Sequence, residues 1–234
     1  MKLSETFLIE KKDILSKKFN IMIPICLGNK FFVEKNIPTE NIIKYISWAL
    51  NNTCEKVLVI VVDRIQDTNY FVRNHSRTEF ASLRRVLKDG NEIKENILDI
   101  ITLNFPDEQN KIEVIRYDDY QKNDIHWAEI THAVYKEFKN NSKFSEAVLN
   151  SVKSSVTDRE FSQEEYWRLC DYVLDEFALA YAGINYKNIN YGVYIYPEPD
   201  AVVRLVENIQ KGLIFSNLNK KLTQRRIGLG ILND

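Results

Sequence analysis

The sequence predicts an α/β fold, in which one Rossmann-like parallel sheet is flanked by helices. Two strongly apolar segments, 19–25 and 56–62, have the composition of strands that are covered on both faces. Strand patterns alternate with helical patterns along the chain, which is typical of parallel strands joined by right-handed crossovers. Because 234 residues suit one α/β domain, we expect a single domain over residues 1–234.

The composition excludes several classes of protein. The hydrophobic content of 44% and the charged content of 28% are those of an ordinary globular chain, and the net charge is −1. A polyanionic partner would therefore need a local basic patch. Three widely spaced cysteines and three histidines without metal-ligand spacing argue against a disulfide framework and a metal site. With no Gly-x-Gly-x-x-Gly, P-loop or membrane-length apolar run, we expect no cofactor, no membrane segment and a cytoplasmic location.

The first half of the chain contains two buried-strand patterns separated by a helix. Residues 1–18 are polar and rich in lysine, which predicts an N-terminal arm or a short helix before the strand at 19–25. Apolar residues at helical spacing predict an amphipathic helix that ends near Asn51. The strand at 56–62 follows and ends at Asp63. We expect residues 64–74 to form a loop.

A long helix and a third strand follow. Ser76 and Glu79 have the spacing of a capping box, which predicts a helix from there toward Leu103, with Gly90 as a point where it could bend. Alternating residues predict a strand at 111–116.

The second half is mainly helical. Helical spacing extends over 124–157, and Ser162 with Glu165 forms another capping box that opens a helix to about Tyr181. A strand at 191–196 precedes a helix over 200–211 that Gly212 ends, and residues 216–234 are expected to form a loosely ordered tail.

The strand at 19–25 leads into a candidate nucleophile. Pro24-x-Cys26-x-Gly28 is a thiol counterpart of a strand–turn nucleophile elbow, with Gly28 allowing a tight turn. The carboxyl edge of an open parallel sheet is also where ligands bind. The alternative interpretation is that Cys26 is a small apolar core residue, which is the common role of an unpaired cysteine.

Two further pairs of residues have spacings that place their polar side chains on one face of a helix or strand. Tyr172 and Glu176 are four residues apart and share one helix face, where a partly desolvated carboxylate would favour an ammonium ligand. Tyr194 and Tyr196 share one strand face. The alternatives are an ordinary surface pair and an aromatic core, respectively.

Taken together, these pieces resemble a known family. Cys26-Leu-Gly-Asn29, Tyr172-x-x-x-Glu176 and Tyr196-Pro197 occur in the order and at about the separations found in the tRNA-dependent cyclodipeptide synthases. The resemblance spans roughly residues 19–215. It implies a fold similar to the catalytic domain of class I aminoacyl-tRNA synthetases without ATP chemistry, and two aminoacyl-tRNAs as substrates.

The resemblance also implies a role for each matched residue. Cys26 would accept the first aminoacyl group, Tyr172 and Glu176 would hold its α-ammonium, and Tyr196 would assist later transfer and ring closure. A second aminoacyl-tRNA would then react to leave a dipeptidyl-enzyme, whose free amine closes on the thioester to a cyclic dipeptide. Gly28 would leave room for the ester carbonyl. The remaining substrate-binding residues would be Met22, Pro24, Asn29, Ile60, Val62, Leu179, Tyr194 and Pro197.

The sequence departs from the family pattern at three points. The family nucleophile is serine, so Cys26 is either a natural thiol variant or an engineered replacement. Asn29 resembles one subgroup and Tyr196-Pro197 the other, and we favour the Tyr-Pro side. The arginine run of some members is missing, since segment 91–96 is nearly neutral. A tRNA patch would use Arg73, Arg77, Arg84, Arg85 and Lys88, or the lysines at 11, 12, 17 and 18.

Two other functions stay open at this stage. A thiol hydrolase would need a histidine base, and neither His126 nor His132 lies at a predicted strand end. A non-catalytic tRNA- or protein-binding module would keep the sheet without the covalent chemistry. The identities of the two joined amino acids cannot be read from the sequence, and we expect a monomer.

Overall fold

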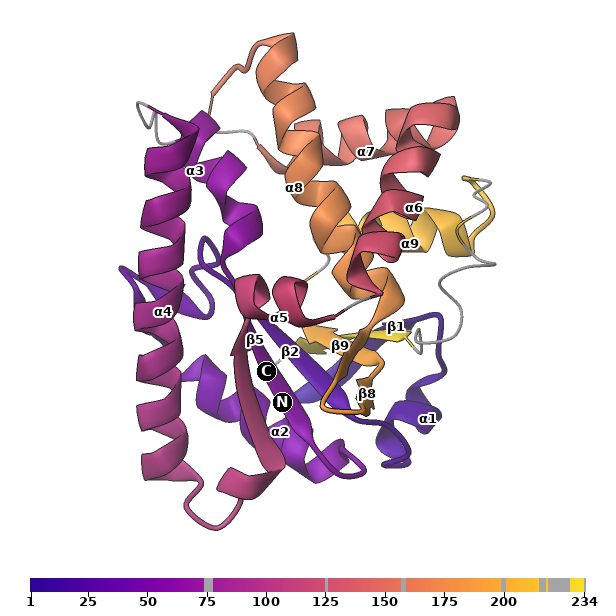
Figure 1. Ribbon diagram of the computed structural model, residues 1–234. Coiled ribbons are helices and arrows are strands. Elements are labelled where there is room, and N and C mark those ends of the chain that lie inside the picture. The colour runs from indigo at the N-terminus through magenta and orange to yellow at the C-terminus, as the bar shows by residue number, and fades with distance from the viewer. Residues whose placement is uncertain are drawn as a thin grey trace.

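A computed structural model describes residues 1–73, 78–124, 126–156, 159–198, 201–214, 218 and 228–233. It confirms an α/β fold built on one main sheet, whose strands lie in the order β1-β10-β9-β2-β5-β6 (Figure 1). Neighbouring strands are parallel except β1 and β10, which are antiparallel. The strands are β1 (Lys2–Phe7), β2 (Ile21–Cys26), β5 (Val57–Val62), β6 (Ile112–Arg116), β9 (Val193–Tyr196) and β10 (Gly228–Asn233).

The helices α2 (Asn41–Asn52) and α4 (Glu79–Asn104) connect the parallel strands β2, β5 and β6. Both were predicted, and the side chains of β2 and β5 are buried throughout. The predicted capping box is wrong, because Thr78 caps α4 by accepting a hydrogen bond from the Ala81 N–H. Ser76 lies outside the described residues. α4 runs unbroken through Gly90.

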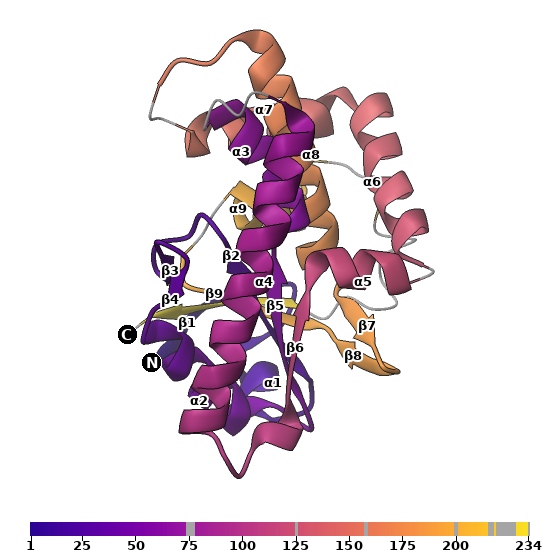
Figure 2. The same cartoon turned by 60° about the vertical axis from the view of Figure 1, so that its left-hand side comes forward.

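A layer of helices covers the carboxyl ends of the parallel strands (Figure 2). The predicted helix over 124–157 is two helices that meet at Asn141, whose side chain caps α7 through the Phe144 N–H. The capping box of Ser162 and Glu165 at the start of α8 is confirmed. The layer consists of α3 (Asp67–Arg73), α6 (Trp127–Asn140), α7 (Ser142–Ser155), α8 (Gln163–Ala182) and α9 (Ala201–Gln210).

The remaining elements are short. Two hairpins, β3 (Val33–Glu34) with β4 (Ile37–Pro38) and β7 (Ile184–Tyr186) with β8 (Ile189–Tyr191), lie outside the main sheet. The others are α1 (Lys11–Leu15), α5 (Tyr117–Asn123) and the 3₁₀ helices η1 (Arg64–Gln66) and η2 (Gln109–Lys111).

Three features of the chain differ from the predictions. The short helix expected within residues 1–18 is present as α1, but residues 2–7 form a strand that was not predicted. Residues 228–233, expected in a loosely ordered tail, form β10, which lies inside the sheet between β1 and β9. β10 contains two glycines, which are unusual in strands, but a side chain at Gly228 or Gly230 would overlap Ile9 or Leu3. The segment 64–74, expected as a loop, contains η1 and α3.

β2 and β9 separate before they reach their carboxyl ends. They pair at Ile21↔Val193 and Met22↔Tyr194, whereas β2 stays paired with β5 up to Cys26↔Val62. Pro24, which has no N–H to donate, lies just beyond the last β9 pair. The direction in which strands are added to the sheet also changes at this point. β5 and β6 lie on one side of β2, and β9 and β10, which come later in the chain, lie on the other. In open α/β sheets such a switch point is the ligand-binding crevice.

A buried carboxylate fixes the end of β5 beside this crevice. Asp63 is fully buried, accepts a 2.7 Å hydrogen bond from Arg116 Nε, and accepts others from the Arg64 and Asp118 N–H groups. Burial raises the pKa of Asp63, and the Arg116 bond and charge oppose that rise. A Cβ on Gly90 would lie 2.5 Å from the Asp63 Cβ, so α4 can approach β5 this closely only with glycine at position 90.

Three carboxylates lie together on the helices that flank the crevice. Burial and the negative charge of Asp171 raise the pKa of Asp175 to about 7, and Asp67 on α3 adds to that rise. Tyr135 on α6 hydrogen-bonds to Asp175 and opposes the rise. Relative to the unfolded chain, the folded protein therefore shifts Asp175 toward its protonated form.

Gly90→Ala should destabilise the protein by about 1–3 kcal/mol, because the new methyl group overlaps Asp63 and this outweighs the better helix propensity of alanine. Gly28→Ala is the matched control, since a Cβ at Gly28 meets no atom within 4 Å. Urea unfolding of both variants measures the difference. Equal stabilities for the two variants would contradict the close α4–β5 packing.

Asp175→Asn should remove a pH dependence of stability. The folded-state pKa is raised, so the contribution of Asp175 is complete below about pH 4 and is lost as pH rises through about 7. Relative to wild type, the variant should gain about 1–4 kcal/mol between pH 5 and pH 8, at about 1.4 kcal/mol per pKa unit. Denaturant unfolding at both pH values tests this, with the exposed Asp99→Asn as the control. Parallel pH profiles for all three proteins would refute the assignment.

Candidate active site

A cavity of about 1010 Å³ opens where β2 and β9 separate. The turn after β2 and the segment after β9 form its floor, through residues that include Cys26, Asn29, Tyr196 and Pro197. Three helical segments, η1 with α3, the end of α7, and α8, supply most of the walls, each through one face at i, i+3 and i+4 spacing. The wall residues are Gln66, Asn69, Tyr70 and Arg73 from η1 and α3, Val152, Ser155 and Val156 from the end of α7, and Leu169, Tyr172 and Val173 from α8.

The predicted nucleophile and the predicted carboxylate are in contact. The Cys26 Sγ–H donates to Glu176 Oε1 at 3.3 Å, so the end of β2 meets the middle of α8. Both side chains are buried, with exposed fractions of 4% for Cys26 and 1% for Glu176. Cys26 nevertheless lines the cavity, and so its sulfur lies between the core and a space that can hold a ligand.

Three donors surround the Glu176 carboxylate. Tyr172 and Cys26 hydrogen-bond to it, and the Tyr194 hydroxyl donates to Oε1 at 3.5 Å. Burial raises the pKa of Glu176, and these three hydrogen bonds oppose that rise. The same burial, together with the nearby Glu176 charge, raises the pKa of the Tyr172 phenol. A buried carboxylate with a raised pKa is a better proton acceptor than a solvated one.

Asn29 links the nucleophile turn to the end of β9. Its Nδ2 donates to the Tyr196 hydroxyl at 2.7 Å, while its Oδ1 accepts from the Phe31 N–H at 2.9 Å. Its backbone N–H donates to the Cys26 carbonyl at 3.0 Å. Thus the asparagine of one subgroup pattern and the Tyr196-Pro197 of the other coexist in one site, and the Asn29 side chain holds the phenol.

The expected wall residues fall into two groups. Gly28, Asn29 and Pro197 line the cavity, whereas Tyr194 does not line it and hydrogen-bonds to Glu176, the partner of Cys26. The other expected residues are buried within the sheet or α8 and do not line it: Met22, Pro24, Ile60, Val62 and Leu179. They lie at or before the carboxyl ends of tightly paired strands, or one turn beyond Glu176 on α8, where neighbouring side chains cover them.

Gly28 does not act as predicted in the turn. Its φ lies outside the left-handed region, and a Cβ would project into open space, so the turn itself does not require glycine. Gly28 keeps the cavity floor clear of a side chain instead.

Sequence reasoning missed the wall that η1 and α3 supply. The spacing of Gln66, Asn69, Tyr70 and Arg73 is that of a helix face, but the segment is short and polar, which favoured a loop. The α7 wall was missed as well, because nothing in its sequence distinguishes Val152 and Val156 from core residues.

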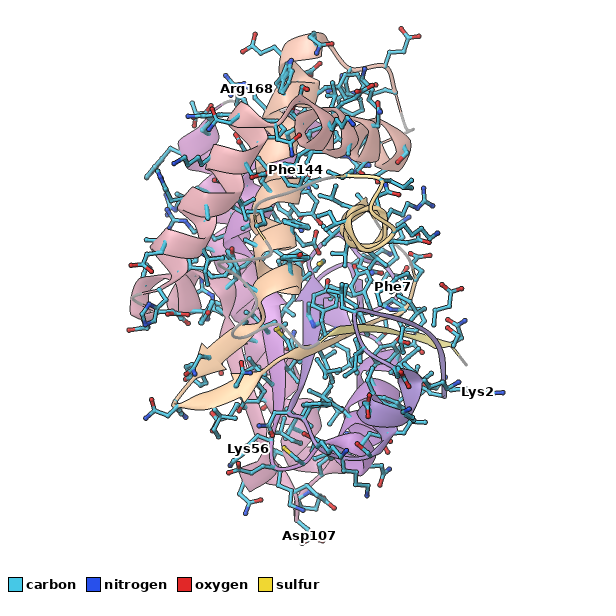
Figure 3. The ribbon with its side chains drawn as sticks, turned by 90° about the vertical axis from the view of Figure 1, so that its right-hand side faces the viewer. Lys2, Phe7, Lys56, Asp107, Phe144 and Arg168 are labelled. Atoms are coloured by element: carbon cyan, nitrogen blue, oxygen red, sulfur yellow. The ribbon has the colours of Figure 1, made fainter. Side chains whose placement is uncertain are left out.

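The predicted basic residues lie in two places. Arg73 lines the cavity, and Arg84, Arg85 and Lys88 are exposed on the first half of α4, which packs on α3. Arg77 lies outside the described residues. The alternative lysines, at positions 11, 12, 17 and 18, are on or next to α1, at the opposite end of the sheet from the helical layer (Figures 1 and 2). Figure 3 shows the same two ends, with Phe144 and Arg168 at the helical end and Lys56 and Asp107 at the other.

The described residues contain no other candidate for the chemistry of this site. Neither His126 nor His132 lines the cavity, so a histidine base for a thiol hydrolase is missing from the described part of the chain. Within the same residues, no group of three or more His, Cys, Asp and Glu side chains could hold a metal ion. Among the described helices, none combines the length and the apolar character that crossing a bilayer requires.

The chain is similar to known proteins in structure, although not in sequence. Neither a protein-family model nor a curated protein sequence matches the chain. A cyclodipeptide synthase from Staphylococcus haemolyticus has a similar structure, with a TM-score of 0.76 and 20% identity over 100% of this chain and 98% of its own. Another, from Bacillus thermoamylovorans, gives a TM-score of 0.74 and 18% identity over 95% of this chain and 92% of its own.

A third similar structure, from Mycobacterium tuberculosis, is described as showing that cyclodipeptide synthetases are related to type I tRNA synthetases. Its TM-score is 0.72, with 15% identity over 94% of this chain and 87% of its own. The similarity extends over nearly the whole of each chain. This chain therefore has the fold of the cyclodipeptide synthases, as its three motifs predicted.

Proposed function

We propose that this protein is a tRNA-dependent cyclodipeptide synthase, an aminoacyltransferase that joins two aminoacyl groups through a covalent intermediate on Cys26. The contact between the Cys26 thiol and the buried Glu176 carboxylate, at the edge of a ligand-sized cavity, is the observation that carries the proposal. The shared fold supports it. The substrates are already activated esters, so the reaction needs no ATP.

In the first step, Cys26 Sγ attacks the ester carbonyl of an aminoacyl-tRNA. Glu176 Oε1, which already accepts the thiol hydrogen, takes the proton as the C–S bond forms. The C–O bond to the tRNA 3′ oxygen breaks, and the proton passes from Glu176 to that oxygen. The products are an aminoacyl thioester on Cys26 and a free tRNA.

Glu176 is then ionised again and serves a second purpose. Its carboxylate and the Tyr172 hydroxyl hold the α-ammonium of the bound aminoacyl group, which compensates the buried negative charge. A thioester remains reactive toward amines, and so the cysteine in place of serine is compatible with the later steps.

In the second step, the α-ammonium of the Cys26-bound group loses a proton to water, and the resulting amine attacks the ester carbonyl of another aminoacyl-tRNA. A peptide bond forms, the second tRNA leaves with a proton on its 3′ oxygen, and the dipeptide stays on sulfur. The new terminal amine then attacks the thioester carbonyl. The C–S bond breaks, the thiol regains its proton, and a diketopiperazine is released. Tyr196, fixed by Asn29, hydrogen-bonds to the reacting carbonyl in these steps.

The exposed cations on the first half of α4 would bind the tRNA. Arg84, Arg85 and Lys88 lie on the helix that packs against the cavity wall, and Arg73 lies in that wall. Phosphate contacts of this kind position a nucleic acid without reading its sequence. We place the reaction in the cytoplasm, where charged tRNAs are made, and expect a monomer.

Incubation with one radiolabelled aminoacyl-tRNA should leave label on the wild-type protein, and Cys26→Ala should abolish it because the acyl acceptor is gone. Cys26→Ser is the matched control and should retain label as an oxygen ester. Neutral hydroxylamine should release the label from wild type faster than from Cys26→Ser, since thioesters are the more reactive. Label that persists in Cys26→Ala would refute the covalent step.

The rate of acylation should rise with pH through the pKa of Glu176, which burial raises above its ordinary value of 4.5. Glu176→Gln should lose this acid limb and slow acylation by about 10²- to 10⁴-fold. Single-turnover labelling between pH 5 and 8 measures both effects. Glu146→Gln, on the exposed side of α7, is the control and should keep the limb. An unchanged limb in Glu176→Gln would show that another group accepts the proton.

A further inference from the structure

We infer that Gln66 and Asn69 form an amide subsite that selects an aminoacyl group with a neutral, hydrogen-bonding side chain. The inference rests on the proposed function, because it concerns which aminoacyl groups enter the cavity. It predicts that at least one residue of the cyclic dipeptide carries a carboxamide or a hydroxyl group.

The cavity has one polar wall and two mainly apolar ones. The η1–α3 wall presents Gln66, Asn69, Tyr70 and Arg73, whereas α7 and α8 present mainly Val152, Val156, Leu169 and Val173. A side chain bound between these walls would meet aliphatic groups on one side and amides on the other. This arrangement fits an amphipathic side chain better than a purely aliphatic one.

Gln66 is unusually buried for a glutamine. Its exposed fraction is 3%, and its backbone N–H donates to the Asp63 carbonyl at 2.8 Å, directly after β5. A buried amide destabilises a protein unless its hydrogen bonds are made. Asn69 supplies one of them, since its Nδ2 donates to Gln66 Oε1 at 3.0 Å.

The bond between the two amides leaves a defined set of groups for a ligand. It uses one donor and one acceptor, so an N–H group of Gln66 and the carbonyl oxygen of Asn69 remain, and no other described side chain hydrogen-bonds to either amide. Reversing both amides would leave the same combination of one donor side and one acceptor side. A carboxamide or hydroxyl, which can both donate and accept, complements this pair.

The subsite should discriminate against two other classes of side chain. An aliphatic side chain would cover the amides without replacing their bonds to water, which is costly for buried polar groups. A cationic side chain would lose its hydration to two neutral amides and would meet the like charge of Arg73 in the same wall. The neutral hydrogen-bonding class is therefore favoured.

The test supplies the purified protein with a tRNA pool charged with all the standard amino acids, and mass spectrometry identifies the cyclic products. Wild type should yield mainly products that contain Asn, Gln, Ser, Thr or Tyr. Gln66→Met has nearly the same shape without the amide, and should lower the ratio of these products to aliphatic ones by at least about tenfold. Gln163→Met, on the exposed start of α8, is the control and should leave the ratio unchanged.

The outcomes separate this inference from the proposed function. Cyclic dipeptides that carry only aliphatic or charged side chains, or an unchanged ratio in Gln66→Met, would overturn the subsite and leave the synthase proposal intact. Absence of any cyclic dipeptide from wild type would overturn both. If Gln66→Met no longer accepts label at Cys26, Asn69→Leu decides the matter, and should shift the ratio in the same direction.

Discussion

The early end of pairing between β2 and β9 is the constraint on which the site depends. If the two strands stayed paired up to the end of β9, Tyr196 would lie opposite Pro24, and the closed sheet would leave no opening beside Cys26. Because pairing stops at Met22 and Tyr194, the last residues of each strand border an opening. The helical layer covers that opening, and α8 places Glu176 against the thiol at the end of β2.

Burial raises the pKa of the Glu176 carboxylate and also makes its ionised form unfavourable in free energy. Glu176 is almost fully buried, and its ionised form depends on hydrogen bonds from Tyr172, Tyr194 and Cys26. These donors come from α8, β9 and β2, so the charge is stabilised only when all three elements are in place. Asn29 connects the turn after β2 to the end of β9 at the cavity floor through the Tyr196 hydroxyl. The site thus acts as a polar connection between layers that otherwise pack through apolar side chains.

The sequence predicted which side chains meet at the candidate site better than it predicted the cavity around them. Cys26, Tyr172, Glu176 and Tyr196 were identifiable because each occupies a strand end or a helix face, and periodicity locates both. Met22, Ile60 and Leu179 were assigned to the wall wrongly, since periodicity does not say whether a buried side chain meets a ligand or another residue. Whether an inward-facing residue borders the cavity depends on where strands separate, which is a tertiary property.

Two elements escaped prediction for a different reason. α3 is short and polar, and β10 contains Gly228 and Gly230, so local propensity argued against both. Tertiary contacts override that propensity in both elements. α3 forms one side of the cavity, and the glycines of β10 allow Ile9 and Leu3 to pack against the strand.

The position of β10 has a consequence for how the molecule folds. Ser4 on β1 hydrogen-bonds to Ile231, 227 residues away, so this half of the sheet closes a very long loop, whereas β2, α2 and β5 make their contacts locally. Long-range pairing of this kind is slow to form, because the entropy of closure is lost before any contact compensates for it. Until β10 arrives, β9 has an open edge and β1 has no partner, and an open edge can pair with another chain. Assembly of β1 and β10 is therefore the stage at which a nascent or refolding molecule is most exposed to self-association.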